Sequence, residues 1–221
     1  MKGIKLLFAL FIAATSFGQV GISGGLSSLK AFGPNKPWGG FHIGIEVPRD
    51  DQASYFFRFT HHFPVKENDS LAISLMPRDI NNVPSGMPYY PTIGSLPSMN
   101  YNIFEFGTRY YLGSGYDFGW AGYGGTNFVL TFNKVRSNPA DYDQEIYYID
   151  DVYNYEGTAF SLGFGLNGGV KYSRPPWGTV YFDISIAYIL LYQQNTNSMY
   201  NSMIRPLTFG FNLGYRKDIL W

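Results

Sequence analysis

The chain has 221 residues, with 16 Lys and Arg against 16 Asp and Glu, and it contains no cysteine. A formal charge of zero gives no electrostatic basis for binding nucleic acid, and the lack of cysteine excludes disulfides, thiol catalysis and cysteine metal sites. Tyr and Phe number 19 each and Gly 26, a composition that favours strands over helices.

Residues 1–18 have the pattern of an export signal. Lys2 and Lys5 precede an unbroken apolar run over residues 6–14, and small residues occupy the positions within residues 15–18 that a signal peptidase reads. The run is too short to span a bilayer as a helix. We therefore predict that residues 1–18 are a cleaved signal peptide and that residues 19–221 form one mature domain. A retained anchor helix is the alternative.

Eight segments alternate in hydropathy with the period of two that is typical of strands. They are Val20–Ser28, Trp38–Val47, Ala53–Phe63, Asn100–Leu112, Phe118–Phe132, Thr158–Tyr172, Thr179–Leu191 and Leu207–Arg216. Each is long enough to cross a bilayer when it is tilted. No other stretch of the mature chain has the roughly 20 apolar residues of a membrane helix, so strands would have to make any span.

The connections between these segments alternate between short and long. Short turns rich in Pro, Gly, Asp and Ser occupy Pro48–Gln52, Gly113–Asp117 and Ser173–Gly178. The longer connections are Leu29–Pro37, Pro64–Met99, Asn133–Gly157 and Tyr192–Pro206. Short periplasmic turns and long outer loops are the layout of an outer-membrane barrel. A soluble exported β-sandwich, the alternative fold, has no reason to follow it.

The two faces of each segment differ in chemistry. One phase is aromatic and aliphatic, as in Phe160, Phe164 and Ile184, whereas the other carries nearly all the charges and many of the glycines. An arginine that faced lipid at mid-depth would cost roughly 2–4 kcal/mol. We therefore predict an all-β fold, an eight-stranded antiparallel transmembrane up-and-down β-barrel, with its polar phase inside.

These features resemble the small outer-membrane β-barrel family of the outer membrane protein A and X type, and the resemblance covers nearly all of the mature chain. Its C-terminal insertion signal is matched by four residues in order: Thr208, Gly210, Leu213 and Tyr215. The resemblance implies that the barrel-assembly machinery reads this strand during insertion into the cell outer membrane. One departure is that the chain continues beyond the motif to Trp221.

The inward phase supplies a candidate interior polar network. Its members are Arg58, Glu105, Arg109, Lys171, Asp183 and Arg216. A barrel of eight strands has an interior just wide enough for its own side chains, so we expect these charges to pair with one another. A conducting or ligand-holding lumen is the alternative.

Catalytic and metal sites are poorly supported by the sequence. His42 and His62 lie in the inward phase, but no serine is convincingly placed beside either as a nucleophile, and His61 points outward. The acidic segment Asn133–Gly157 lacks the fixed spacing of a calcium loop, so we read it as a solvated loop. We predict no catalytic residues, no metal and no cofactor.

The longest connection, Pro64–Met99, combines apolar residues that we expect to be exposed with many prolines, which exclude regular structure over most of it. Such a loop suits a plug over the barrel mouth or a partner-binding surface. Aromatic residues near the strand ends suit interfacial girdles. They are Trp38, Tyr110, Tyr111, Trp120, Tyr172, Trp177, Tyr188 and Tyr192.

The function that this pattern favours is not enzymatic. We expect an integral outer-membrane protein with a structural or partner-binding role through its long extracellular loops, for example as an accessory subunit of an envelope complex. The expected partners are outer-membrane lipid, the barrel-assembly machinery and an envelope protein, with no nucleic acid. A narrow channel for small or hydrophobic solutes is the first alternative, and a lipid-modifying barrel enzyme is the second.

Overall fold

The computed structural model describes residues 19–31, 36–66, 71–150, 157–195 and 206–220. The predicted signal peptide at residues 1–18 and the terminal Trp221 lie outside these ranges. Eight long strands form a closed barrel. They are β1 Gln19–Ala31, β2 Trp38–Asp50, β3 Ala53–Lys66, β6 Ser98–Gly113, β7 Gly119–Arg136, β9 Gly157–Arg174, β10 Gly178–Asn195 and β11 Leu207–Leu220.

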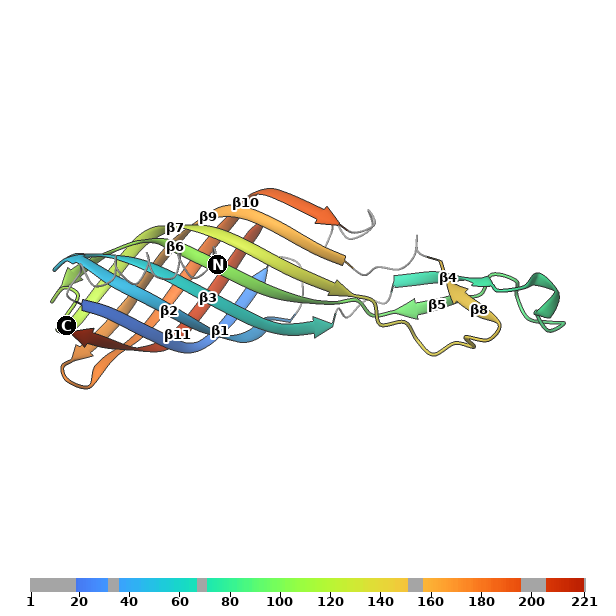
Figure 1. Cartoon of the computed structure of the whole chain (residues 1–221), viewed down its shortest axis with the longest axis horizontal. Coiled ribbons are helices and arrows are strands. Elements are labelled where there is room, and N and C mark those ends of the chain that lie inside the picture. The colour runs from blue at the N-terminus through green and yellow to red at the C-terminus, as the bar shows by residue number, and fades with distance from the viewer. Residues whose placement is uncertain (1–18, 32–35, 67–70, 151–156, 196–205, 221) are drawn as a thin grey trace, which may run out of the picture.

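The barrel closes by pairing its first strand with its last. Its strand order is β1-β11-β10-β9-β7-β6-β3-β2 and all eight pairs are antiparallel. Gln19 of β1 pairs with Leu220 of β11, and the strands run obliquely around the axis (Figure 1). Closure removes both sheet edges, so every strand finds a partner for its backbone groups. The predicted barrel is therefore confirmed.

The alternation along each strand shows which side chains face outward and which face the lumen. Along β9, outward Phe160, Phe164 and Leu166 alternate with inward Ser161, Gly165 and Asn167. Apolar side chains on the outer wall of neighbouring strands are exposed in the same way, whereas the arginines of the inward phase are buried. This is the arrangement of a barrel whose surrounding solvent is lipid. No helix of the described chain is long and apolar enough to cross a membrane.

A small sheet built from two of the long loops stands on the end of the barrel opposite the short turns (Figure 1). Its central strand β4, Leu71–Pro77, pairs with β5, Thr92–Ser95, and with β8, Tyr147–Ile149. A single 3₁₀ turn, η1 at Ile80–Asn82, follows β4. We call residues 71–95 and 137–150 the protrusion. The prolines were expected to exclude regular structure over most of this connection, but β4 and β5 form within it, because every proline of the connection except Pro77, the last residue of β4, lies outside these two strands.

Two residues assigned to the interfacial girdles were also placed wrongly. Trp38 and Tyr111 are buried inside the barrel. Trp38 has the same parity as His42, and Tyr111 the same parity as Arg109, so each belongs to the inward phase of its strand. The other predicted girdle residues are exposed, and Trp120 packs on Tyr172 with 5.1 Å between ring centroids.

Candidate functional site

The interior of the barrel contains a layer of alternating charges centred on Asp183. This carboxylate is 0 % exposed and accepts hydrogen bonds from Arg58 Nη1 at 2.9 Å, Arg109 Nη2 at 3.1 Å and Asn212 Nδ2 at 2.7 Å. The Tyr123 hydroxyl donates to the same carboxylate at 3.2 Å. A buried carboxylate with this many donors is satisfied in full, which is the condition for burying a charge at tolerable cost.

The chain of charges extends in both directions from Asp183. Arg58 forms a bidentate ion pair with Glu105, in which Nε lies 2.6 Å from Oε2 and Nη2 lies 3.0 Å from Oε1. On the other side Arg109 Nη1 lies 2.9 Å from Glu46, and Arg216 Nη1 lies 3.2 Å from the same oxygen. Three arginines thus face three fully interior carboxylates, so the layer is neutral overall.

The structure places all six predicted network residues inside the barrel but does not give them equal roles. Five of them take part in ion pairs, whereas Lys171 Nζ donates to the Tyr116 carbonyl at 2.7 Å and to Ser173 Oγ at 2.8 Å. Glu46 is not in the predicted network, but it has the same inward phase on β2 as His42 and pairs with two of the network's arginines. The alternation along a strand shows whether a residue faces inward or outward, but only the pairing register between strands shows its level along the barrel axis.

The turn between β6 and β7 closes the end of the barrel where the short turns lie. Tyr116 folds under the lumen, with the Arg216 guanidinium 3.7 Å from its ring centroid and its hydroxyl donating to Asp218 at 3.1 Å. Burial raises the pKa of this hydroxyl, which therefore stays a donor. Gly115 permits the fold of this turn, since its φ is +76° and a Cβ would lie 2.6 Å from the Asp51 carbonyl.

An apolar cluster closes the lumen at the opposite end. Trp38 donates its indole N–H to the Met99 carbonyl at 2.9 Å and packs edge-on against Tyr101 at 5.1 Å. Ile73 of the protrusion packs into the same cluster. The other buried members are Leu29, Ala31, Ile103, Val129 and Val135. A hollow of about 30 Å³ separates this cluster from the charged layer, enough room for roughly two water molecules.

These two closures predict an electrically silent protein. We expect the purified barrel, reconstituted in planar bilayers, to give no single-channel steps, because both the charged layer and the apolar cluster fill the lumen. A porin inserted in the same bilayer serves as the positive control. Reproducible openings of the barrel would favour the channel alternative and contradict a packed interior.

A serine does lie beside His42, contrary to expectation. Ser27 Oγ is 2.8 Å from His42 Nδ1, and Ser27 donates its proton to Asn212 Oδ1 at 2.6 Å. His42 Nδ1 must then carry a hydrogen and donate to Ser27, so it is not positioned to take the serine proton. His42 Nε2 bonds to the hydroxyl of Tyr181 at 2.6 Å instead of to a carboxylate. The trio lacks the proton path of a hydrolase triad and is buried.

The four residues of the predicted insertion signal occupy β11, where it pairs with β1. Thr208 and Gly210 face inward, whereas Leu213 and Tyr215 face outward. Their role in insertion stays a prediction. Within the described residues no group of three or more His, Asp or Glu side chains could hold a metal ion. Asp151 and Glu156 of the predicted solvated acidic segment lie outside the described ranges.

A closed eight-stranded barrel with an apolar outer wall defines an outer-membrane β-barrel protein with transmembrane strands. No family model and no curated protein matches the chain. Neisserial surface protein A is structurally similar, with a TM-score of 0.50 and 12 % identity over 92 % of this chain and 96 % of that one. The predicted resemblance to small eight-stranded outer-membrane barrels is confirmed at the level of the fold.

Two barrels of Pseudomonas aeruginosa are also similar. OprG has a TM-score of 0.48 and 11 % identity over 92 % of this chain and 97 % of that one. The N-terminal barrel domain of OprF has a TM-score of 0.47 and 10 % identity over 90 % of this chain and 97 % of that one.

Proposed function

We propose that this protein is a non-enzymatic outer-membrane surface protein that binds a protein partner outside the cell through its protrusion, as an accessory subunit of an envelope complex would. The observation that carries the proposal is a set of exposed apolar side chains at the far end of the protrusion. Ile80, Met87, Tyr89 and Tyr90 are 57 %, 51 %, 55 % and 59 % exposed. We call these four residues the tip.

The tip stands well beyond the barrel, at the far end of the protrusion (Figure 1). The barrel's apolar belt is only about 25 Å tall, so lipid does not explain the exposed apolar groups. Aromatic residues and methionine are enriched in protein interfaces, and an exposed apolar patch commonly marks one. A protein partner is therefore the better explanation.

The segment that carries the tip is ordered by its own hydrogen bonds. Arg78 donates to the Gln144 carbonyl at 2.9 Å, and Tyr147 OH donates to the Pro88 carbonyl at 2.9 Å. A turn joins Met87 N to the Pro84 carbonyl at 3.0 Å, with Gly86 at a φ of +98°. An ordered surface loses less conformational entropy on binding than a mobile loop does.

The tip makes a test of this proposal direct. We expect tagged protein from gently solubilised outer membranes to carry a stoichiometric partner, which is lost when the four tip residues are replaced by serine. The matched control replaces two exposed acidic residues of the protrusion, Asp141→Asn and Glu145→Gln, and should retain the partner. A partner that stays on the tip variant, or the absence of any partner from the wild type, would contradict the proposal.

The proposal includes the route to the membrane. Residues 1–18 act as a cleaved export signal, and the outward Leu213 and Tyr215 of β11 are read by the barrel-assembly machinery. β11 is the strand that closes the barrel against β1, which suits a strand recognised during insertion.

A further inference from the structure

The outer wall of the barrel has a hollow at the rim that bears the protrusion. Its volume is about 470 Å³. The lining residues that matter are the rings of Phe132 and Phe160 and the polar Asn102, Lys134, Thr158 and Gln193. Aromatic rings beside polar and cationic groups, on a wall that faces lipid below and water above, fit the junction between a lipid tail and its head group.

The register explains how these side chains come together. Asn102 of β6, Phe132 of β7, Phe160 of β9 and Gln193 of β10 form one row across four adjacent strands. Lys134 and Thr158 pair directly in the next row outward. Asn102 is held in place, since its Oδ1 lies 2.7 Å from His61 Nδ1 and its Nδ2 donates to the Phe132 carbonyl at 3.1 Å.

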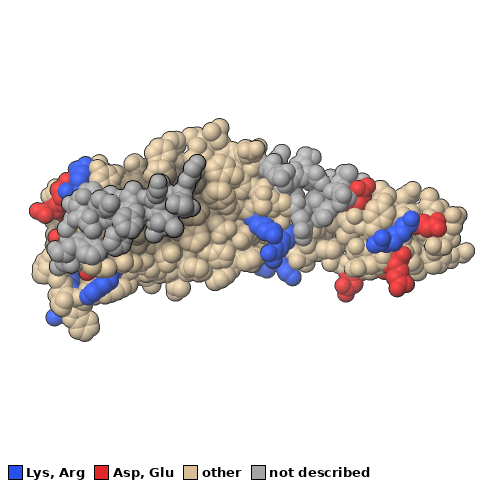
Figure 2. Space-filling model, viewed as in Figure 1, with Lys and Arg blue, Asp and Glu red and all other residues tan. Residues whose placement is uncertain are grey.

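Cationic side chains above the hollow have no carboxylate partner among the residues that the structure describes. Lys134 and Arg136 both point outward, two residues apart on β7, directly above Phe132. Lys66 of β3 lies at the level of Arg136, two strands away. None of these three forms an ion pair within the described chain. Figure 2 shows Lys and Arg gathered where the barrel meets the protrusion, with Asp and Glu farther out.

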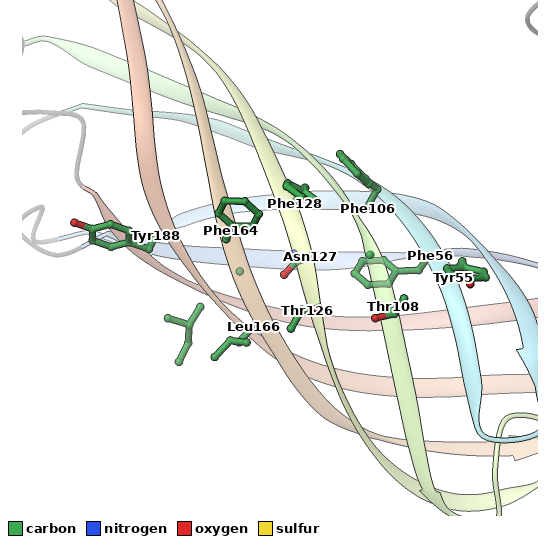
Figure 3. Close-up of a pocket in the computed structure, with 13 residues that line it drawn as sticks. Tyr55, Phe56, Phe106, Thr108, Thr126, Asn127, Phe128, Phe164, Leu166 and Tyr188 are labelled. Carbon is green, nitrogen blue, oxygen red and sulfur yellow. The ribbon is translucent and has the colours of Figure 1, made fainter.

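A separate apolar groove lies on the same wall nearer the middle of the membrane, with the row of Phe104, Leu130 and Leu162 between it and the hollow. It has a volume of about 650 Å³ and runs from β3 across β6, β7 and β9 to β10. Figure 3 shows Phe106, Phe128 and Phe164 along one side of it and the smaller Thr108, Thr126 and Leu166 along the other. Phe128 lies four residues below Phe132 on the same face, about 13 Å along the strand.

We propose that the hollow and the groove together bind a phosphorylated glycolipid of the outer leaflet, of the lipid A class. Its phosphate lies against Lys134 and Arg136, with Lys66 nearby, and an acyl chain follows Phe132 and Phe160 down to Phe128 and Phe164. Arginine and lysine at a membrane surface favour phosphate, and the flat aromatic groove accepts a hydrocarbon chain at the depth where such chains lie.

The charges argue against a second copy of the barrel as the occupant. Two copies inserted in the same direction would bring Lys134 and Arg136 to the same height as the partner's identical cations. Like charges facing each other would repel, whereas an anionic lipid neutralises them. This site is separate from the tip, so the lipid proposal does not depend on the protein-partner proposal.

The test is native mass spectrometry of the purified barrel in detergent, titrated with diphosphorylated lipid A. We expect the Lys134→Gln, Arg136→Gln variant to bind it about 10-fold or more weakly than the wild type. The matched control, Arg174→Gln with Lys217→Gln, removes two exposed cations at the opposite end of the barrel and should bind as the wild type does.

Two further arms keep the test decisive. Lipid A stripped of phosphate should bind the wild type about as weakly as diphosphorylated lipid A binds the variant. Added salt should weaken the binding of diphosphorylated lipid A to the wild type. Both measurements use the wild type, so they remain informative even if the variant fails to fold. Equal binding of phosphorylated and stripped lipid would overturn the phosphate site. A wild-type dimer that the Gln substitutions strengthen would assign the hollow to a second copy, which would also overturn the proposal.

Discussion

The Asp183→Asn variant should lose about 3–5 kcal/mol of unfolding free energy, the cost expected when one partner is removed from a buried ion pair. Asp183 lies between Arg58 and Arg109, so its loss leaves three interior arginines facing two carboxylates. The new amide oxygen can still accept hydrogen bonds, but the side chain supplies no charge. Urea titration of the barrel in lipid vesicles, followed by tryptophan fluorescence, measures the effect.

A second substitution separates charge balance from packing. Arg109→Gln added to Asp183→Asn restores neutrality, and Glu46 keeps its other partner, Arg216, at 3.2 Å. The double variant should therefore recover part of the lost stability. Asp141→Asn, at an exposed carboxylate of the protrusion, should stay within about 0.5 kcal/mol of the wild type. A single Asp183→Asn variant as stable as that control would show that the charged layer contributes little.

The barrel itself was predictable because alternate residues of each strand face lipid and lumen, and their hydropathy differs accordingly. Seven of the eight predicted segments lie within barrel strands, and the eighth begins one residue before β7. The strands extend past the predicted ends, as β7 does to Arg136, because cations such as Lys134 and Arg136 interrupt the apolar phase where the wall leaves the membrane. Apolar alternation therefore marks the lipid-facing part of a strand and understates its full length.

The protrusion was not predictable in the same way. Its central strand, β4, pairs with β5 from the same loop and with β8 from a loop about 70 residues farther along the chain. Short pairings between distant segments leave no periodic signal in either segment alone. Ile73 is an example, because it is buried against barrel residues that the sequence around Ile73 does not identify.

Predicting which inward side chains meet requires their level along the barrel axis as well as the face of the strand on which they lie. Ser27 and His42 lie on adjacent strands, but they meet through the β1 to β2 register, in which Ser27 pairs with Gly40 and Gly25 with His42. Without that register, the sequence could not place a serine beside His42. Glu46 was missed from the network for the same reason, although its inward phase was evident from the alternation of β2.

Leu166→Arg should cost about 2–4 kcal/mol of unfolding free energy, the depth-dependent penalty for arginine at the bilayer midplane. Leu166 is 61 % exposed on the outer wall of β9. It lies six residues from Tyr172 near one rim and six from Phe160 near the other, so it sits at the middle of the lipid-facing wall. The arginine would have to draw water inward or distort the lipid around it.

Thr158→Arg is the matched control, because Thr158 faces outward on the same strand two residues beyond Phe160. An arginine there reaches the head groups and should cost only about 0–1 kcal/mol. Both variants are compared by urea titration in vesicles of the same lipid. Equal costs at the two positions would mean that the wall of β9 does not face a hydrocarbon core, and the assignment of its two faces would have to be reversed. A larger cost at Leu166 follows only if lipid, and not water, surrounds this barrel.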